Sequence, residues 1–174
     1  AYLDTFMPPK TIRPRKNVVI QLCTDSHAWK YQFCFTTESH DFQTALKAWH
    51  AVGANIHIWD YTTSFVHYMV PMPNMPVVSD NMRFYLANGA KGIMLQGAYQ
   101  SPGGDRAPMR SWVWAKQLWN PDLDTRALMR DFVFGYYGEA GQPMWDYNMM
   151  LWKMWETAHA IPHKDDGTKP VPNP

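Results

Sequence analysis

The sequence lacks the features that would assign it to several common classes of protein. Neither sign of charge dominates, because 16 Lys and Arg residues stand against 15 Asp and Glu residues. This balance argues against nucleic acid or an anionic membrane as the main partner. No apolar run approaches the roughly 20 residues of a membrane-spanning helix, so we expect no membrane span. The opening residues, AYLDTFMPPK, lack the basic start and apolar run of a signal peptide.

Cysteines and ligand-binding motifs are also scarce. Cys23 and Cys34 are the two cysteines; they could form a disulfide, but they do not define a redox compartment. The stretch SPGGD at 101–105 lacks the Lys and the Ser or Thr of a phosphate-binding loop. No second histidine stands at ligand spacing from His57, so we expect a buried, hydrogen-bonded imidazole there, with no metal and no cofactor.

Large side chains, by contrast, are abundant. The 174 residues include 9 Trp, 9 Tyr, 8 Phe and 12 Met. Most of them are expected in the core. An excess of aromatic residues also suits a protein that stacks on sugar rings, because the C–H faces of those rings are apolar.

Hydrophobic patterning alternates between strands and helices. Stretches typical of strands occur at 1–5, 17–25, 54–63 and 90–99. Helices are predicted at 41–54, 77–89, about 107–118, about 124–137 and about 141–159. Such alternation predicts an α/β protein with a parallel sheet covered by helices.

The long strands each have one aliphatic face and one mixed face. Ile56 and Ile58, for example, oppose His57, Trp59 and Tyr61. A closed (β/α) barrel accounts for this pattern, because its aliphatic residues point outward to the helices and the others point inward. Four strands make half of a (β/α)8 TIM-type barrel, so we expect more chain before residue 1 or the association of two halves.

Four stretches carry a resemblance to a known family. They are PPKTIRPRKNVVIQLC, IWDYTTSFVHYMVPMPNM, KGIMLQGAY and AKQLWNPDLDTRALMRDFVFGYYGEAG. Together they resemble the bacterial domain-of-unknown-function family 4838 over residues 1 to about 158. That family is similar to glycoside hydrolases of the α-glucuronidase and β-hexosaminidase kinds.

The resemblance implies a domain plan, a partner and a location. Residues 1–120 would form the C-terminal half of the barrel, 121–160 helices that pack on it, and 161–174 a Pro-rich tail. The partner would be the remaining half of the barrel, from the same polypeptide or from a second copy. Similar proteins act on carbohydrates outside the cytoplasm, so a secreted or periplasmic location is expected.

Carboxylates at strand ends are the candidates for catalysis, because glycoside hydrolysis uses two of them. Asp25 shares the inward parity of Cys23, and relatives tend to have an acidic residue near that position. Asp60 has the outward parity of Ile58 and reaches the barrel mouth only if the strand ends or bulges there. For Asp105 a structural role at a helix start is the better interpretation. In related barrels the proton donor follows the fourth strand, so we expect this chain alone to be inactive.

Polar and aromatic side chains on the inward face are the candidates for binding sugar. Trp59 and Tyr61 can stack on a pyranose, and Gln96 can donate to and accept from a hydroxyl. His57 lies deeper, and Tyr99 follows on the next loop. The sequence therefore predicts a glycoside-hydrolase-like segment that acts on or binds a polysaccharide or glycan. The alternative is a non-catalytic carbohydrate-binding or structural fragment of a barrel.

Overall fold

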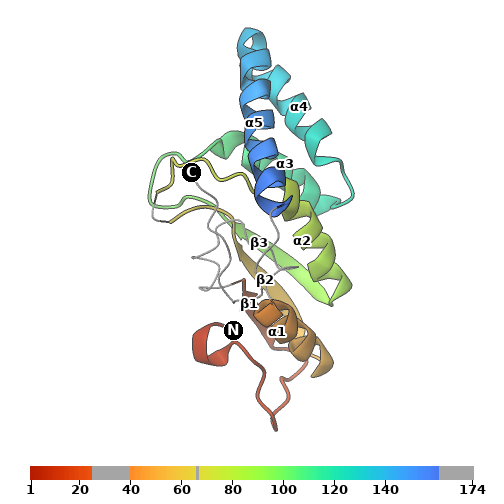
Figure 1. Ribbon diagram of the computed structural model, residues 1–174. Helices are drawn as coiled ribbons and strands as arrows, with labels where there is room; N and C mark the ends of the chain where they lie inside the picture. Colours follow the sequence, from red (N-terminus) through yellow and green to blue (C-terminus); the bar gives the residue numbers. More distant parts are fainter. Residues whose placement is uncertain (25–39, 66, 161–174) are drawn as a thin grey trace.

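The computed structural model describes residues 1–24, 40–65 and 67–160 of the chain. Figure 1 shows its elements, which are η1 (Leu3–Thr5), β1 (Val19–Cys23), α1 (His40–Ala51), β2 (Asn55–Tyr61), α2 (Met75–Ala87), β3 (Ala90–Gln96), α3 (Ala107–Trp119), α4 (Thr125–Tyr137), η3 (Gly138–Ala140) and α5 (Gly141–Ala160). The five predicted helices are confirmed, with ends that shift by a few residues. The expected tail, 161–174, lies outside the described residues.

The strands form a parallel sheet in the order β1-β2-β3. In its register Leu22 faces Ile58, and Trp59 stands between Cys23 and Met94. The expected mixed α/β fold with a parallel sheet is therefore confirmed. Because successive side chains of a strand alternate between faces, this register sorts the side chains of the three strands onto two surfaces.

One surface of the sheet is covered by helices. Leu22, Ile56 and Ile58 are fully buried against α1, whose apolar side is formed by Phe42, Ala45, Leu46 and Trp49. Burying each such aliphatic side chain contributes about 1.5–3 kcal/mol. The apolar side of α1 therefore packs on the aliphatic face that alternation gives to β1 and β2.

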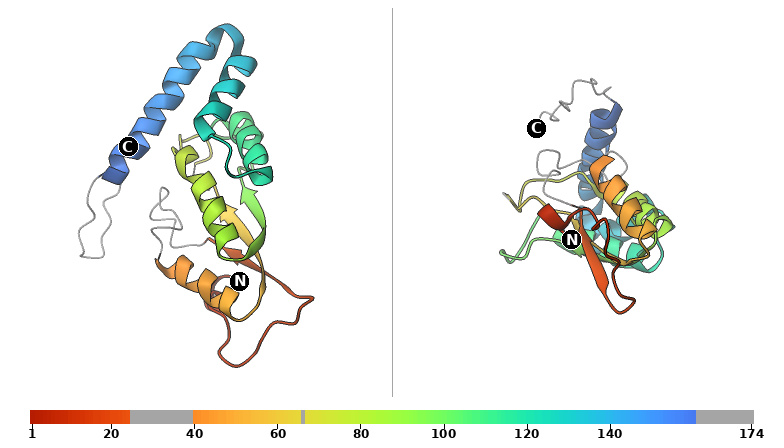
Figure 2. Two further views of the ribbon diagram at one scale, coloured as in Figure 1. Left: turned by 90° about the vertical axis from the view of Figure 1, so that its right-hand side faces the viewer. Right: turned by 90° about the horizontal axis from the view of Figure 1, so that it is seen from below.

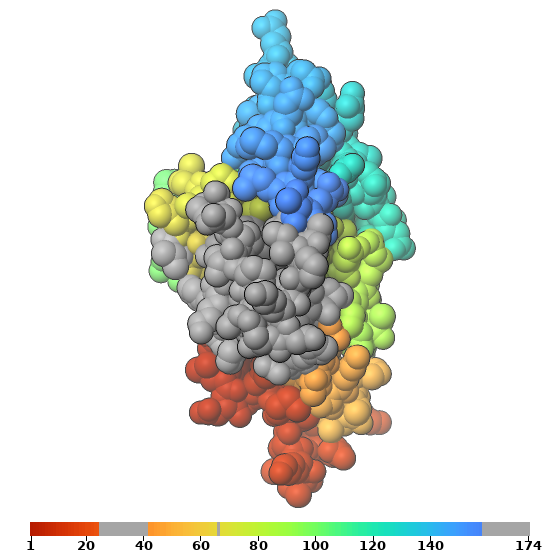
Figure 3. All heavy atoms as spheres, viewed as in Figure 1, coloured from red at the N-terminus to blue at the C-terminus, as the bar shows by residue number. Residues whose placement is uncertain are grey.

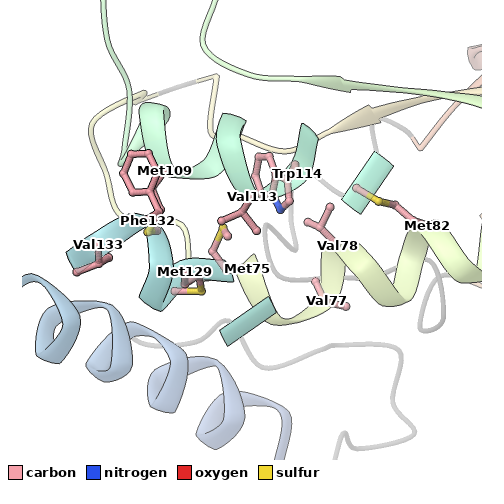
Figure 4. Packing of buried hydrophobic residues seen from close by; sticks show 10 residues of the cluster. All are labelled: Met75, Val77, Val78, Met82, Met109, Val113, Trp114, Met129, Phe132 and Val133. Carbon is pink, nitrogen blue, oxygen red and sulfur yellow. The ribbon is translucent and has the colours of Figure 1, made fainter. Parts of the chain in front are cut away.

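A second core joins the later helices. Figure 4 shows its buried side chains, which come from α2, α3 and α4: Met75, Val77, Val78, Met82, Met109, Val113, Trp114, Met129, Phe132 and Val133. Trp145, Met149 and Trp152 of α5 pack against them. These large side chains of α5 therefore pack in the interior, as expected for most of the Trp and Met residues. Figure 2 shows α4 and α5 as a pair that projects away from the sheet.

Two helix ends follow the sequence signals. The Asp124 carboxylate accepts a hydrogen bond from the Ala127 amide (2.6 Å), which caps α4. Gly89 follows α2 with a φ of +86°, a left-handed conformation that glycine adopts without a steric penalty. The His50 side chain fills the space where a Cβ of Gly89 would lie.

The predicted strand at 1–5 is wrong. Residues Leu3–Thr5 form a 3-10 turn, which Thr5 closes by accepting a hydrogen bond from the Tyr2 amide and donating one to the Tyr2 carbonyl. A short hydroxyl side chain competes in this way with strand pairing. Ala1 alone lies along the outer edge of β1, where its amino group donates to the Gln21 carbonyl. The Cys23 amide in turn donates to the Ala1 carbonyl (3.2 Å).

Candidate functional site

The second surface of the sheet carries polar and aromatic side chains. We call it the mixed face; its members include Gln21, Cys23, His57, Trp59, Tyr61, Met94 and Gln96. Cys23 is buried and the other six are exposed or half-buried, whereas the opposite surface of β2 is fully buried at Ile56 and Ile58. Among the described residues the helices cover the aliphatic surface and leave the mixed face without a covering helix, so we take the mixed face as the candidate site.

Five aromatic rings form a continuous cluster that begins on the mixed face. The Trp59 and Tyr61 centroids are 6.3 Å apart, and Tyr61 meets Phe65 edge to face at 5.5 Å. Phe65 also contacts Tyr68 (6.0 Å) and Tyr99 (6.2 Å). This aromatic cluster therefore spans the carboxyl end of β2 and the loops after β2 and β3, the end at which parallel α/β proteins hold ligands.

The side chains of Trp59 and Gln96 meet across β2 and β3. The indole Nε1 of Trp59 donates to Gln96 Oε1. This bond fixes the orientation of the amide, and in the described part of the chain no acceptor meets its Nε2 group. A half-buried amide held in this way presents two N–H donors to a ligand that lies beside the indole.

A buried ion cluster holds the loops that carry the aromatic rings. Asp105 pairs with Arg106 (2.7 Å) and with Arg110 (3.1 Å), and it accepts a hydrogen bond from the Met72 amide (3.0 Å). The Asp105 amide donates to the Tyr68 carbonyl (2.8 Å). The loops after β2 and β3 are thus joined to the start of α3. The expected structural role of Asp105 fits this arrangement.

The same cluster links the loops to α5. Arg106 adopts a left-handed φ of +48°, and its guanidinium donates to Asn148 Oδ1 (2.9 Å). Burial lowers the pKa of Arg110 to about 9, so its guanidinium remains charged at neutral pH. Burial by itself would raise the pKa of Asp105, but the hydrogen bond and charge of Arg106, with Arg110, hold it below its ordinary value.

Asp60 lies on the opposite side of β2 from Trp59 and Tyr61. Its carboxylate is buried and accepts hydrogen bonds from the hydroxyls of Thr24 (2.8 Å) and Tyr85 (2.9 Å). Burial raises the pKa of Asp60 to about 6, although these donors favour the charged form. The outward parity read from the sequence holds, because β2 continues as a regular strand through Tyr61. A catalytic role for Asp60 stays a prediction.

His57 is exposed, so the expectation of a buried imidazole is wrong. Its ring lies over Gly92 of the neighbouring strand, where a Cβ would come within 3.0 Å of two imidazole atoms. Because glycine leaves that space open and no described helix covers the mixed face, the imidazole stays accessible. No cluster of three or more His, Cys, Asp or Glu side chains suited to a metal ion occurs within residues 1–24, 40–65 and 67–160.

The remaining candidates divide between the surface and the undescribed segment. Tyr99 is 65% exposed at the outer end of the aromatic cluster. Asp25 lies outside the described residues, as does Cys34, so a disulfide between Cys34 and the buried Cys23 stays one of the two alternatives that the sequence leaves open.

Sequence reasoning missed Phe65, Tyr68 and the arginine pair. Phe65 and Tyr68 stand in a stretch that has no periodicity, so no pattern predicts that their rings join those of Trp59 and Tyr61. Arg110, five residues after Asp105, donates to the Asp105 carboxylate. Its guanidinium also donates to the Thr62 and Met72 carbonyls. The spacing of Asp105 and Arg110 was the one available signal, since such a pair can meet across the start of a helix.

Comparison with known proteins supplies the family. Residues 1–148 match the model of a family described as a domain of unknown function (DUF4838), and the chain belongs to that family. No curated protein and no solved structure gives a significant match. In the described part of the chain, no helix is long and apolar enough to cross a membrane.

Proposed function

We propose that the chain is part of a carbohydrate-active (β/α)8 barrel and that its aromatic cluster binds a sugar. The observation that supports it best is the continuous aromatic surface that begins at Trp59 and Tyr61, on the face of the parallel sheet that no described helix covers. An indole face stacks well on the apolar C–H face of a pyranose. The Gln96 amide, oriented by the Trp59 indole, is suited to donate to a hydroxyl at the ring edge.

The barrel part of the proposal rests on the sheet. All three strands run in parallel, and the described helices cover one face, as in one sector of a barrel wall. Ala1 donates to the Gln21 carbonyl and accepts from the Cys23 amide, which is the hydrogen-bond pattern of two parallel strands. The outer edge of β1 can therefore pair with a further strand that runs in the same direction. In this proposal residues 1–120 supply half of the barrel, and the rest comes from the same polypeptide or a second copy. An exported location belongs to the same proposal.

Binding without hydrolysis is the second candidate, and the position of Asp60 favours it. A glycosidase needs a carboxyl pair flanking the scissile bond. Asp60 lies on the helix side of β2, and the Asp105 carboxylate is paired with two arginines, so the two do not form such a pair. If the protein is an enzyme, its carboxyl pair therefore includes residues outside the described part of the chain, and Asp25 is the candidate that the sequence offers.

The test compares Trp59→Ala with Trp119→Ala in the full chain. Trp119 is 92% exposed at the end of α3, away from the aromatic cluster, and serves as the matched control. The probes are soluble oligomers of hexose, of N-acetylhexosamine and of glucuronate-substituted xylose, with binding measured by calorimetry. Loss of a stacking aromatic is expected to weaken binding about 30-fold or more, since hot-spot side chains contribute about 2 kcal/mol or more. Equal affinities in the two variants, or no binding of any oligomer, would contradict the proposal.

Release of reducing ends from a bound oligomer separates the two candidates. The polypeptide assayed has to include the rest of the barrel, because this chain alone is expected to be inactive. Turnover by that polypeptide that is lost in Asp25→Asn supports hydrolysis, and sugar binding without turnover by the same polypeptide supports the non-catalytic candidate.

The barrel is tested by hydrogen exchange. The Gln21 amide points to the same edge of β1 as that of Cys23, so a paired further strand would slow its exchange, whereas exchange within seconds would contradict the barrel.

A further inference from the structure

Positive charge is segregated at one end of the sheet, although the whole chain is nearly neutral. Residues 5–18 contain Lys10, Arg13, Arg15 and Lys16 and no Asp or Glu. Residues 43–59 and 81–104, which include the turns into β2 and β3, also lack acidic residues. The acidic residues lie elsewhere, many of them on α4 and α5 and the segment before them. The balanced total therefore conceals a basic region.

The fold assembles this region at the amino ends of the strands. Asn55, the first residue of β2, donates to the Lys16 carbonyl (2.6 Å) and accepts a hydrogen bond from Lys91 Nζ (2.8 Å). These bonds connect the loop before β1 with the starts of β2 and β3. In Figure 3 the N-terminal segment, in red, forms the lower tip of the molecule. We call residues 7–18 together with Lys91 the basic tip.

No described carboxylate forms an ion pair with the five cations of the basic tip. Elsewhere the chain does pair its cations, as Arg126 with Glu156 shows (2.9 Å). Cations that share one surface without carboxylates repel one another, and this repulsion raises the free energy of the folded chain. An anionic partner would remove the repulsion.

Exposed aliphatic side chains stand among these cations. Ile12 is 68% exposed between Lys10 and Arg13, and Met7 is 48% exposed. Pro8, Pro9 and Pro14 restrict the backbone around them, because the proline ring holds φ near −65°. The loop therefore presents apolar groups and cations together at a limited conformational cost.

We propose that the basic tip docks on an anionic lipid surface. Lysine and arginine side chains near such a surface attract its headgroups, and an aliphatic side chain between them can enter the boundary with the acyl chains. An anionic polysaccharide or a nucleic acid would use the cations but would leave Ile12 in water. The combination of Ile12 with Lys10 and Arg13 therefore favours lipid. This docking is peripheral, it needs no membrane-spanning helix, and it does not depend on sugar binding at the other end of the sheet.

Co-sedimentation of the full chain with vesicles tests the proposal. Vesicles of phosphatidylcholine with added phosphatidylglycerol should bind the chain, and vesicles of phosphatidylcholine alone should not. The variant Arg13→Gln/Arg15→Gln should bind about 25-fold more weakly, since each cation near the surface contributes about fivefold. The charge-matched control, Lys116→Gln/Lys153→Gln, removes two cations from α3 and α5 and should change binding less than about twofold, because those positions lie beyond the reach of the surface.

The Ile12→Ser variant distinguishes lipid from other polyanions. It keeps every charge, so its binding to vesicles should fall several-fold while its binding to a sulfated dextran stays unchanged. Circular dichroism checks that the exposed substitutions leave the fold intact. Absence of binding to anionic vesicles, equal losses in the two charge variants, or an Ile12→Ser variant that binds vesicles like the parent would each overturn the proposal.

Discussion

The Tyr85 hydroxyl donates a hydrogen bond of 2.9 Å to Asp60 Oδ2, and both residues are buried between the sheet and α2. This bond joins the central strand to the helix that covers it. It also stabilises a charge in a place where burial disfavours one. The pair therefore affects both the stability of the fold and its dependence on pH.

Replacement of Tyr85 by Phe should lower the free energy of unfolding by about 1–3 kcal/mol at pH 7.5, because a buried charged acceptor loses a donor. Urea denaturation followed by circular dichroism measures the change. The control is Tyr99→Phe, whose hydroxyl belongs to a residue that is 65% exposed. That variant should stay within about 0.5 kcal/mol of the parent. Equal changes in the two variants would show that the Tyr85–Asp60 bond contributes nothing to stability.

Asp60 should make the folded state less stable as the pH rises from about 4 to about 6. Its folded-state pKa, about 6, lies above the ordinary value of 3.8, so the folded state holds the proton more tightly. The contribution is present below pH 4 and is lost through pH 6, with a magnitude on the order of 3 kcal/mol. Asp60→Asn should remove this slope from unfolding free energies measured between pH 4 and 7. Asp131→Asn, at an exposed position, should retain it, and the same slope in both variants would refute the assignment.

Asp105→Ala should destabilise the chain by about 3–5 kcal/mol, because it leaves the buried guanidiniums of Arg106 and Arg110 without their carboxylate. Asp80→Ala, which removes an exposed pair with Arg83, should cost about 1 kcal/mol or less. Thermal and urea unfolding give both values. Because the pKa of Asp105 is lowered, its contribution is present above the ordinary carboxyl pKa and is lost on acidification. A small effect of Asp105→Ala would mean that the cluster does not hold the loops.

Gly89→Ala should cost more than Gly97→Ala. At Gly89 the φ is +86° and a Cβ would lie 2.1 Å from His50 Nδ1, so both the backbone and a neighbour must adjust. At Gly97 nothing lies within 4 Å of the added Cβ. We expect a loss of about 1 kcal/mol or more for Gly89→Ala and a change near zero for Gly97→Ala. The melting temperatures of the two variants test this prediction. A lower melting temperature for Gly97→Ala than for Gly89→Ala would contradict the steric argument at Gly89.

The local signals of the sequence predicted most of the elements. Alternation in β2 separated Ile56 and Ile58 from Trp59 and Tyr61. Asp124 and Gly89 are residue types that favour a helix start and a helix end, and they stand at those positions in the structure. The failures have local causes too. Residues 1–5 were expected to form a short strand, but the Thr5 hydroxyl bonds to the Tyr2 backbone and closes a turn. For His57, parity gave the correct face but could not tell whether anything covers it.

By itself the sequence determined the α/β class, the order of the elements and the face of each strand on which a side chain stands. Periodicity and capping act between residues that are near in the chain, so a single sequence contains them. Only the tertiary structure decided that Phe65, Tyr68 and Tyr99 extend the surface begun by Trp59 and Tyr61. It alone decided that Asp60 bonds to Tyr85, and that Lys91 joins residues 7–18 in the basic tip. These relationships join residues from separate loops, helices and strands, and they arise only when packing of the two cores brings those segments together.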